Sequence, residues 1–151
     1  MKPTTKLKLI FLAVMALLYS CTSNSAGPET VSKSEDNCRV VHITDGDTFD
    51  VKCPARPQER IRLMGYDTPE TYYANCPAEK ALGDKATARL RALTRTRQIT
   101  RIERHGYGKY GRVIARVWLG GEDLADIMVG EGLAMRYSGG HRANWCAALN
   151  Q

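Results

Sequence analysis

Two largely β-branched runs flank Asp45-Gly46 and predict a β-hairpin over residues 38–53. Asp-Gly favours a two-residue turn because both residues tolerate the positive φ that such turns need. With this pair at the turn, counting outward along both strands places Cys38 directly opposite Cys53. The pattern therefore predicts the hairpin together with its register.

Three further segments alternate between apolar and polar residues, which is typical of strands with one buried face. They are residues 60–63, 98–104 and 112–119. The first of them runs into Gly65 and a turn over residues 67–70 (DTPE). Residues 105–111 join the other two and contain three glycines in seven positions, which predicts a loop.

Helical spacing of apolar residues predicts a helix over residues 77–94, with Pro77 in its first turn. Its apolar stripe consists of Ala81, Leu82, Ala86, Leu90 and Leu93. The same spacing predicts a second helix over residues 123–129. A short final helix is expected within residues 141–151.

The order β-β-β-α-β-β-α fits an α+β, mainly β fold. We expect a five-stranded Greek-key barrel of the OB type with about three peripheral helices. Such barrels bind nucleic-acid strands across one face, but the fold alone does not determine the function.

The composition is that of an ordinary globular domain, with 43% hydrophobic and 25% charged residues in a chain of 151. Residues 1–20 hold three of the 22 basic residues and no acidic one, so 19 basic residues face 16 acidic ones in the remainder. This mild excess of positive charge permits a phosphate-bearing partner without demanding one.

Residues 1–20 have a basic start and an apolar run too short to span a bilayer, which predicts a signal peptide and export. The expected location is the periplasm, the cell envelope or the extracellular space. Two processing sites stay open, namely lipidation at Cys21 or cleavage after Ala26. Membrane attachment is expected only through a lipid on Cys21. Residues 21–37 have the composition of a disordered tether, followed by one domain over residues 38–151.

Four cysteines remain beyond the leader boundary, and an even number in an exported domain indicates two disulfides. Three pairings are possible. The hairpin register favours Cys38 with Cys53, which leaves Cys76 for Cys146. Metal ligation is disfavoured because no two of these cysteines have C-x-x-C spacing.

Residues 60–70 combine two arginines with two carboxylates, a mixture that suits phosphoryl chemistry. Arginine binds phosphate oxygens in bidentate fashion, and carboxylates hold a hard cation or accept a proton from water. The plain alternative is a surface strand with a salt-bridged turn. Three further acids, Asp45, Asp47 and Asp50, lie in the hairpin, and one of them with Asp67 would make an open calcium site.

Four motifs together resemble the staphylococcal nuclease (thermonuclease) family. They are Asp45-Gly46-Asp47-Thr48, Arg60-Ile61-Arg62-Leu63, Asp67-Thr68-Pro69-Glu70 and Tyr110-Gly111-Arg112. They occur in the order of that family, and the resemblance covers roughly residues 40–137. Each motif alone would be a weak signal.

The resemblance implies a Ca²⁺-dependent nuclease that cleaves DNA and RNA, single-stranded or locally open, and leaves 3′-phosphates. It implies metal ligation by Asp47, Asp67 and the Thr68 carbonyl, with Asp45 in support, and it makes Glu70 the general base. Phosphate binding would fall to Arg62 and Arg112. Nucleotide contacts would come from Lys109, Tyr110 and, as an approximate match, Tyr137. We expect a monomer.

Strict alternation from Arg62 would place Asp67 on the opposite face of the strand, so the proposed site requires a bulge or bend at Gly65. Arg60 matches no functional position and is expected to be solvated. The three histidines are expected to be structural or solvated. Two rival functions stay open, a barrel that binds single strands without cutting them and an envelope interaction domain.

Overall fold

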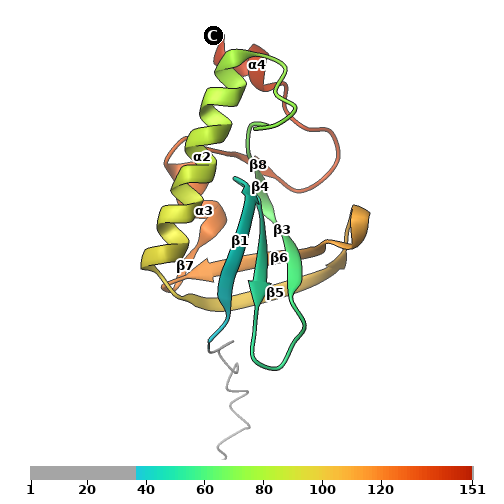
Figure 1. The fold of residues 1–151 in the computed structure, drawn as a ribbon. Coiled ribbons are helices and arrows are strands. Elements are labelled where there is room, and N and C mark those ends of the chain that lie inside the picture. The colour runs from blue at the N-terminus through green and yellow to red at the C-terminus, as the bar shows by residue number, and fades with distance from the viewer. Residues whose placement is uncertain (1–36, 151) are drawn as a thin grey trace, which may run out of the picture. The chain divides into compact units, whose positions relative to one another are not determined.

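The computed structural model describes residues 37–150, which are organised around one mixed sheet (Figure 1). The predicted signal peptide, both processing sites at Cys21 and Ala26, and the tether as far as residue 36 lie outside the described residues. Of the helices in residues 37–150, none combines the length and the apolar character that crossing a bilayer requires.

Eight strands, three α-helices and one 3-10 turn make up the described chain. The strands are β1 (Arg39–Asp45), β2 (Thr48–Lys52), β3 (Glu59–Leu63), β4 (Gly65–Asp67), β5 (Ile99–Tyr107), β6 (Val113–Leu119), β7 (Glu122–Asp123) and β8 (Met135–Tyr137). The helical elements are α2 (Pro77–Thr96), η1 (Lys109–Gly111), α3 (Leu124–Gly130) and α4 (Trp145–Leu149).

The main sheet has the strand order β1-β2-β3-β6-β5, with β7 paired to β6. β3 and β6 are parallel, and the other neighbours in the sheet are antiparallel. A parallel pair needs a long crossover, which α2 and β5 provide here. Figure 1 shows β5 and β6 running across the direction of β1, β2 and β3. The predicted mainly β, α+β fold of the OB type is confirmed.

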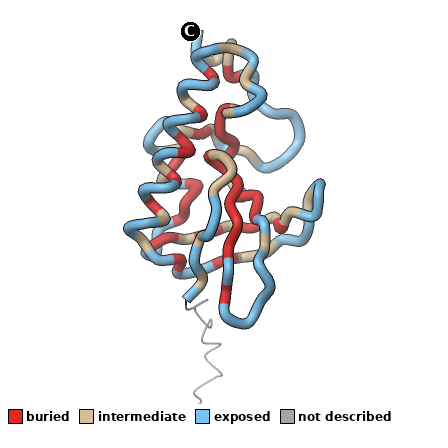
Figure 2. The backbone as a smooth tube through the Cα atoms, viewed as in Figure 1, coloured by how far each residue is buried: buried red, intermediate tan, exposed pale blue. Residues whose placement is uncertain are grey.

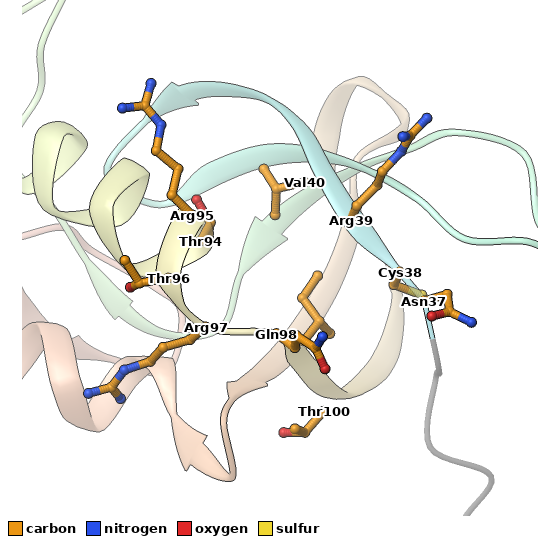
Figure 3. Close-up of a pocket in the computed structure, with 11 residues that line it drawn as sticks. Asn37, Cys38, Arg39, Val40, Thr94, Arg95, Thr96, Arg97, Gln98 and Thr100 are labelled. Atoms are coloured by element: carbon orange, nitrogen blue, oxygen red, sulfur yellow. The ribbon is translucent and has the colours of Figure 1, made fainter.

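The barrel is open rather than closed. β1 and β5 stand at the two ends of the strand order, and within residues 37–150 no pairing joins them. α2 packs against β1, and residues from the end of this helix line a cavity of about 720 Å³ together with the starts of β1 and β5 (Figure 3). The helix end therefore lies at the seam where a β1–β5 pair would close the sheet, as in partly open OB barrels.

The hairpin of β1 and β2 is present, but its turn differs from the predicted one. Asp45 pairs with Thr48, so Gly46 and Asp47 form the turn rather than Asp45 and Gly46. Two register shifts within β1 bring Arg39 opposite Lys52, which is the register expected at the cysteines. The Cys38–Cys53 disulfide follows, with its Cα atoms 4.2 Å apart.

Glycine at position 46 allows the turn to approach its neighbours closely. A Cβ there would lie 2.9 Å from both the Ala86 Cβ and the Thr68 side chain. The Tyr66 hydroxyl also donates to the Gly46 carbonyl at 3.0 Å. These contacts fix the turn between α2 and β4, and with it the position of Asp47.

The N-terminal half of α2 buries a carboxylate and a glycine rather than the start of the predicted apolar stripe. Glu79 and Gly83 are buried, whereas Ala81 is exposed and Leu82 is half-buried. This half packs on the turn after β4, since a Cβ at Gly83 would lie 2.8 Å from the Pro69 carbonyl oxygen. The helix thereby supports the backbone that carries Glu70, while its C-terminal half joins the core as expected.

Burial alternates along β6, is continuous over the first four residues of β2 and covers the last three residues of β3 (Figure 2). The inward side chains of these strands meet the apolar face of α2 and the first turns of α3. Central members of this core, each at most 1% exposed, are Phe49, Val51, Ile61, Leu90, Ala115, Leu119 and Met128. The core is thus a sheet covered by helices, as the periodicity predicts.

The strand is interrupted between β3 and β4, as the predicted site requires. β3 ends at Leu63, and Gly65 starts β4 with a φ of 95°. β4 leaves the main sheet and pairs with β8 instead. The bend predicted at Gly65 is therefore present.

β5 extends further than predicted, because Tyr107 still pairs with Val113 after a bulge. His105 and Gly106 thus belong to a strand, and only residues 108–112 form the connection to β6. The second predicted helix is present as α3, where the Asp123 carboxylate caps the first turn by accepting from the Ala125 amide. α4 lies within the segment predicted as the final helix.

Candidate active site

A buried arginine lies between two buried aspartates at the centre of the candidate site. Arg62 Nη1 is 2.5 Å from Asp47 Oδ2, and Arg62 Nη2 is 2.8 Å from Asp67 Oδ1. The side chains of Arg62, Asp47 and Asp67 are 9%, 4% and 3% exposed. Because the hairpin turn, β3 and β4 each supply one residue, the break at Gly65 is what brings Asp67 to Arg62.

The Asp47 carboxylate accepts hydrogen bonds from two threonines, Thr48 and Thr68. Thr48 Oγ1 donates to its Oδ1 at 3.1 Å, while the Thr68 amide and Thr68 Oγ1 donate to its Oδ2 at 3.2 Å and 3.1 Å. The Asp47 amide in turn donates to Asp45 Oδ1 at 3.1 Å. The observed contacts of Thr68 therefore position Asp47, and ligation through the Thr68 carbonyl stays a prediction.

Two acids at this site have raised pKa values, and burial is the main cause for both. Burial, followed by the charge of Asp47, raises the pKa of Asp45 to about 6. Burial also raises the pKa of Asp67, although Arg142 and Arg62 oppose the shift. A cluster of buried carboxylates with raised pKa values favours an added cation.

The donor atoms fit a hard divalent cation. Asp47 Oδ2 and Asp67 Oδ1 lie 3.8 Å and 2.8 Å from the same atom, Arg142 Nη2, so the two carboxylates converge on one point. Both are oxygen donors, as calcium prefers, and the remaining oxygens of its shell can come from carbonyl groups and water. Asp50, the third acid of the hairpin, pairs with Arg60 instead.

Glu70 lies at the edge of this cluster and is more accessible. Its side chain is 34% exposed, and its backbone amide donates to Glu79 Oε1 at 3.4 Å. Glu79 Oε2 also accepts from the Asn75 amide at 2.6 Å. The buried Glu79 carboxylate thus holds the segment after Glu70 against α2, a role that the sequence pattern did not reveal.

Most of the expected residues line one cavity of about 710 Å³. It is lined by Asp45, Asp47, Arg62, Glu70, Lys109, Arg112 and Tyr137, among others. Arg112 donates from Nε to the Lys109 carbonyl at 3.3 Å and forms no ion pair with a carboxylate among the described residues. Its guanidinium is therefore available to an anionic ligand.

Three expected residues are not among those lining the cavity, namely Asp67 and Thr68, which are buried, and Tyr110. Tyr110 is 93% exposed and has a φ of 62°. Its ring centroid is 6.0 Å from the Arg112 guanidinium carbon, so it contacts the site through that arginine. All three histidines are exposed, and His105 also lines the cavity.

Two site residues were absent from the sequence prediction, Arg142 and Trp145. Arg142 forms ion pairs with Asp47, Asp67 and Glu70, and Trp145 Nε1 donates to Asp67 Oδ2 at 3.4 Å. The predicted Cys76–Cys146 disulfide brings them there by joining α4 to the start of α2. Their nearness to Cys146 was the signal that could have identified them.

Two other features do not make competing sites. The seam cavity in Figure 3 has no carboxylate in its lining, and its arginines point away from one another. Glu79 lies beside Cys76 and Cys146, the one group in residues 37–150 with three potential metal-ligand atoms within 4.8 Å of one another. Both cysteines are oxidised to a disulfide, so no thiolate is available there.

Residues 60–147 match the model of the family described as staphylococcal nuclease homologue. The chain belongs to this family. It is 32% identical over 136 residues to a thermonuclease of Staphylococcus intermedius and 30% identical to one of Staphylococcus hyicus, in both cases over 88% of this chain and 80% of the relative. An uncharacterised endonuclease of Haemophilus influenzae is 28% identical over 85% of this chain and 64% of its own length.

Proposed function

We propose that this staphylococcal nuclease homologue is a Ca²⁺-dependent nuclease that hydrolyses phosphodiester bonds of DNA and RNA with little sequence preference. One observation carries the proposal: Arg62, which pairs with Asp47 and Asp67, lines the same cavity as Glu70 and Arg112. The names of its thermonuclease and endonuclease relatives support the same reaction class.

Asp47 and Asp67 would hold the cation, joined by the Thr68 carbonyl, with Asp45 as a nearby support. A bound divalent cation would supply positive charge that offsets the phosphate anion. The match between two convergent carboxylates and an oxygen-preferring ion supports this assignment.

Arg62 and Arg112 approach a phosphate in the cavity from different elements. Arg62 presents its charge from the buried floor, where both carboxylates fix its orientation. Arg112 belongs to the connection before β6 and lacks a carboxylate partner among the described residues. Preoriented guanidinium groups stabilise negative charge as it builds in the transition state, which is the largest contribution expected from this site.

Glu70 is the general base in this proposal. Its partial exposure gives water access to its carboxylate, and its backbone is fixed through Glu79. Proton removal from the attacking water and departure of the 5′-oxygen would leave a 3′-phosphate. Lys109 and Tyr137 line the same cavity and would contact the nucleotide. An open cavity of this size suits single-stranded or locally open nucleic acid.

The first test replaces Glu70 by Gln. The variant should lose roughly 10²- to 10⁴-fold in turnover, the usual contribution of a general base, while it keeps oligonucleotide affinity. Degradation of single-stranded DNA and RNA is measured with Ca²⁺ and with chelator. Glu131→Gln is the matched control, because Glu131 pairs with Arg89 on the surface.

Three outcomes would contradict the proposal at different points. Intact DNA and RNA in Ca²⁺ would remove the enzyme claim and favour the non-catalytic, strand-binding barrel. Unchanged turnover in chelator would remove the cation. Near-normal turnover of Glu70→Gln would remove Glu70 from the base role.

A further inference from the structure

Arg142 forms ion pairs with all three acids of the acidic cluster, which consists of Asp47, Asp67 and Glu70. Arg62 pairs with only two of these acids, Asp47 and Asp67. Arg142 Nη2 is 2.8 Å from Asp67 Oδ1 and 3.8 Å from Asp47 Oδ2, and its Nη1 pairs with Glu70. It thus contacts both proposed cation ligands and the proposed base. No step of the proposed reaction uses it.

The arginines at the cluster differ in how easily they could leave. Arg62 is 9% exposed and also donates to the Asp47 backbone carbonyl at 3.4 Å. Arg142 is 43% exposed, so its guanidinium can move into water with a smaller desolvation change. Arg62 therefore belongs to the fixed floor of the cavity, and Arg142 is the displaceable cation.

The segment that carries Arg142 is anchored at both ends. Before it, Tyr137 pairs with Gly65 in the β8–β4 sheet. After it, Trp145 is 5% exposed and Cys146 is bonded to Cys76. Between the anchors, Gly139 and Gly140 have φ values of 106° and 90° and no neighbour that a Cβ would meet within 4 Å. The segment can change conformation while the anchors keep Arg142 close to the acids.

A divalent cation competes with guanidinium groups for the carboxylate oxygens that it binds. Asp47 Oδ2 and Asp67 Oδ1 face both Arg62 and Arg142 in this structure. Because Arg62 is buried and Arg142 is partly exposed, a cation that binds between these acids would separate Arg142 from at least one of them. Anchoring keeps the guanidinium at a high local concentration, which makes its competition with the cation effective.

We propose that Arg142 is a tethered counter-ion of the acidic cluster, displaced when the divalent cation binds. It acts as a positioning residue that sets the affinity for the cation, and the Cys76–Cys146 disulfide holds it in competition. The inference rests on the proposed function only in taking Asp47 and Asp67 as the cation ligands.

The test measures calcium binding rather than turnover. The oxidised protein is titrated with Ca²⁺ by calorimetry, without nucleic acid. Removing the competing charge in Arg142→Gln should tighten Ca²⁺ binding by about tenfold, since one charge pair at this range contributes on that order. Arg136→Gln is the matched control, because Arg136 is 56% exposed and pairs with Asp126 outside the cluster.

A second variant at Arg142 and a double-mutant cycle test whether charge and the disulfide act through this arginine. Arg142→Lys retains the charge and should bind Ca²⁺ with an affinity between those of the parent and Arg142→Gln. Cys76→Ser with Cys146→Ser should also tighten Ca²⁺ binding, but add little once Arg142 is already Gln. Circular dichroism confirms that each variant is folded.

Trp145 offers an independent readout because its indole contacts Asp67. In a Trp118→Phe background it is the one remaining tryptophan. Its emission should change on Ca²⁺ addition at the same midpoint as the calorimetric titration.

The outcomes separate this inference from the proposed function. Ca²⁺ affinity that is unchanged or weaker in Arg142→Gln overturns the counter-ion role, even if the protein cleaves DNA. Tighter Ca²⁺ binding in a protein that leaves DNA intact supports the role of Arg142 and removes the nuclease claim. A parent that binds no Ca²⁺ overturns both the cation assignment and this inference.

Discussion

Two arginines of β3, two residues apart, serve different partners. Arg62 is buried and bridges Asp47 with Asp67, whereas Arg60 is 54% exposed and contacts Asp50 at 2.7 Å. Arg60 was expected to be solvated, and it is exposed, although it also has a cross-strand partner on β2. Both side chains lie on the same face of β3, with Arg62 near the end that leads to the site and Arg60 near the other end, opposite Asp50.

The Asp50–Arg60 pair predicts a loss of stability in acid. Hydrogen bonding from Arg60 is the largest influence that lowers the pKa of Asp50 below its ordinary value of 3.8. A lowered pKa means that the pair stabilises the fold above that value, and that this contribution disappears as pH falls through the folded-state pKa. Asp50→Asn should therefore be less stable than the parent near neutrality, with a difference that shrinks below about pH 4.

Urea unfolding at several pH values, with chelator present, measures this difference. Asp84→Asn is the control, because Asp84 is 51% exposed and forms a helix-surface pair with Lys80. It should change stability little at any pH. A gap between Asp50→Asn and the parent that stays constant into strong acid would contradict the prediction.

At the residue scale, the sequence predicted the residues whose placement depends on local pattern. Alternation along β3 predicted the face on which Arg62 lies, and Gly65 predicted the bend that brings Asp67 to it. Arg142 could not be found in this way, because it meets Glu70 across 72 positions of sequence and belongs to no motif. Glu79 was not predicted because helical periodicity identifies buried positions by their apolar residues, and Glu79 carries a buried carboxylate.

The break between β3 and β4 is the element on which the site depends. It lets two consecutive strands join different sheets, β3 beside β6 and β4 beside β8. Gly65 has a φ of 95°, and a Cβ added there would lie 3.0 Å from the Ala125 Cβ. Both the backbone conformation and the packing against α3 therefore require glycine.

Gly65→Ala should destabilise the protein by roughly 1–2 kcal/mol through the left-handed backbone, with a further loss from the contact with Ala125. It should also reduce turnover, because β4 carries Asp67. Thermal unfolding and DNA cleavage measure the two effects. Gly121→Ala is the control, since Gly121 has a φ of 88° but nothing within 4 Å of an added Cβ.

The control should lose stability without losing turnover per folded molecule. Equal turnover losses in both variants would mean that general destabilisation, rather than the placement of Asp67, explains the effect of Gly65→Ala.

At the element scale, strands and helices followed from periodicity, while the junctions did not. The hairpin turn moved by one residue because packing of Gly46 against Ala86 and Thr68 outweighs the local preference for Asp-Gly. β5 continued to Tyr107 because a bulge absorbs the register change that the glycines introduce. Both differences arise from tertiary contacts that a local pattern does not contain.

The two disulfides constrain the whole domain at different ranges. Cys38–Cys53 closes a separation of 15 residues, and Cys76–Cys146 closes one of 70. Chain-entropy arguments give roughly 3 kcal/mol and 4–5 kcal/mol of stabilisation, respectively. An oxidising compartment is consistent with such bonds, and we propose that the protein is exported.

Intact-mass analysis of the protein recovered from the envelope or the medium tests export and oxidation together. The mass should lack residues 1–20 and should rise by about 4 Da on reduction of both disulfides. An acylated Cys21 would identify a lipoprotein, and a chain that begins near residue 27 would identify ordinary cleavage. A retained leader or a free thiol would contradict the prediction.

At the scale of the whole molecule, the fold class followed from the order of elements, but the openness of the barrel did not. The order of elements along the chain is encoded in successive periodic segments. The gap between β1 and β5 lies where the end of α2 packs. The periodicity of the helix does not predict this packing. The same holds for the cavity, whose rim includes residues from the C-terminal segment.

The two register shifts in β1 have a consequence for insertions and deletions. One end of the hairpin is fixed by the disulfide and the other by the contacts of Asp47, so each end keeps its place independently of the other. Val41 and Thr44 lie at the shifts between them and have no partner in the β1–β2 ladder. We therefore expect β1 to accommodate a one-residue change in length at these positions, a freedom useful for engineering that the stretch from Arg62 to Asp67 does not offer.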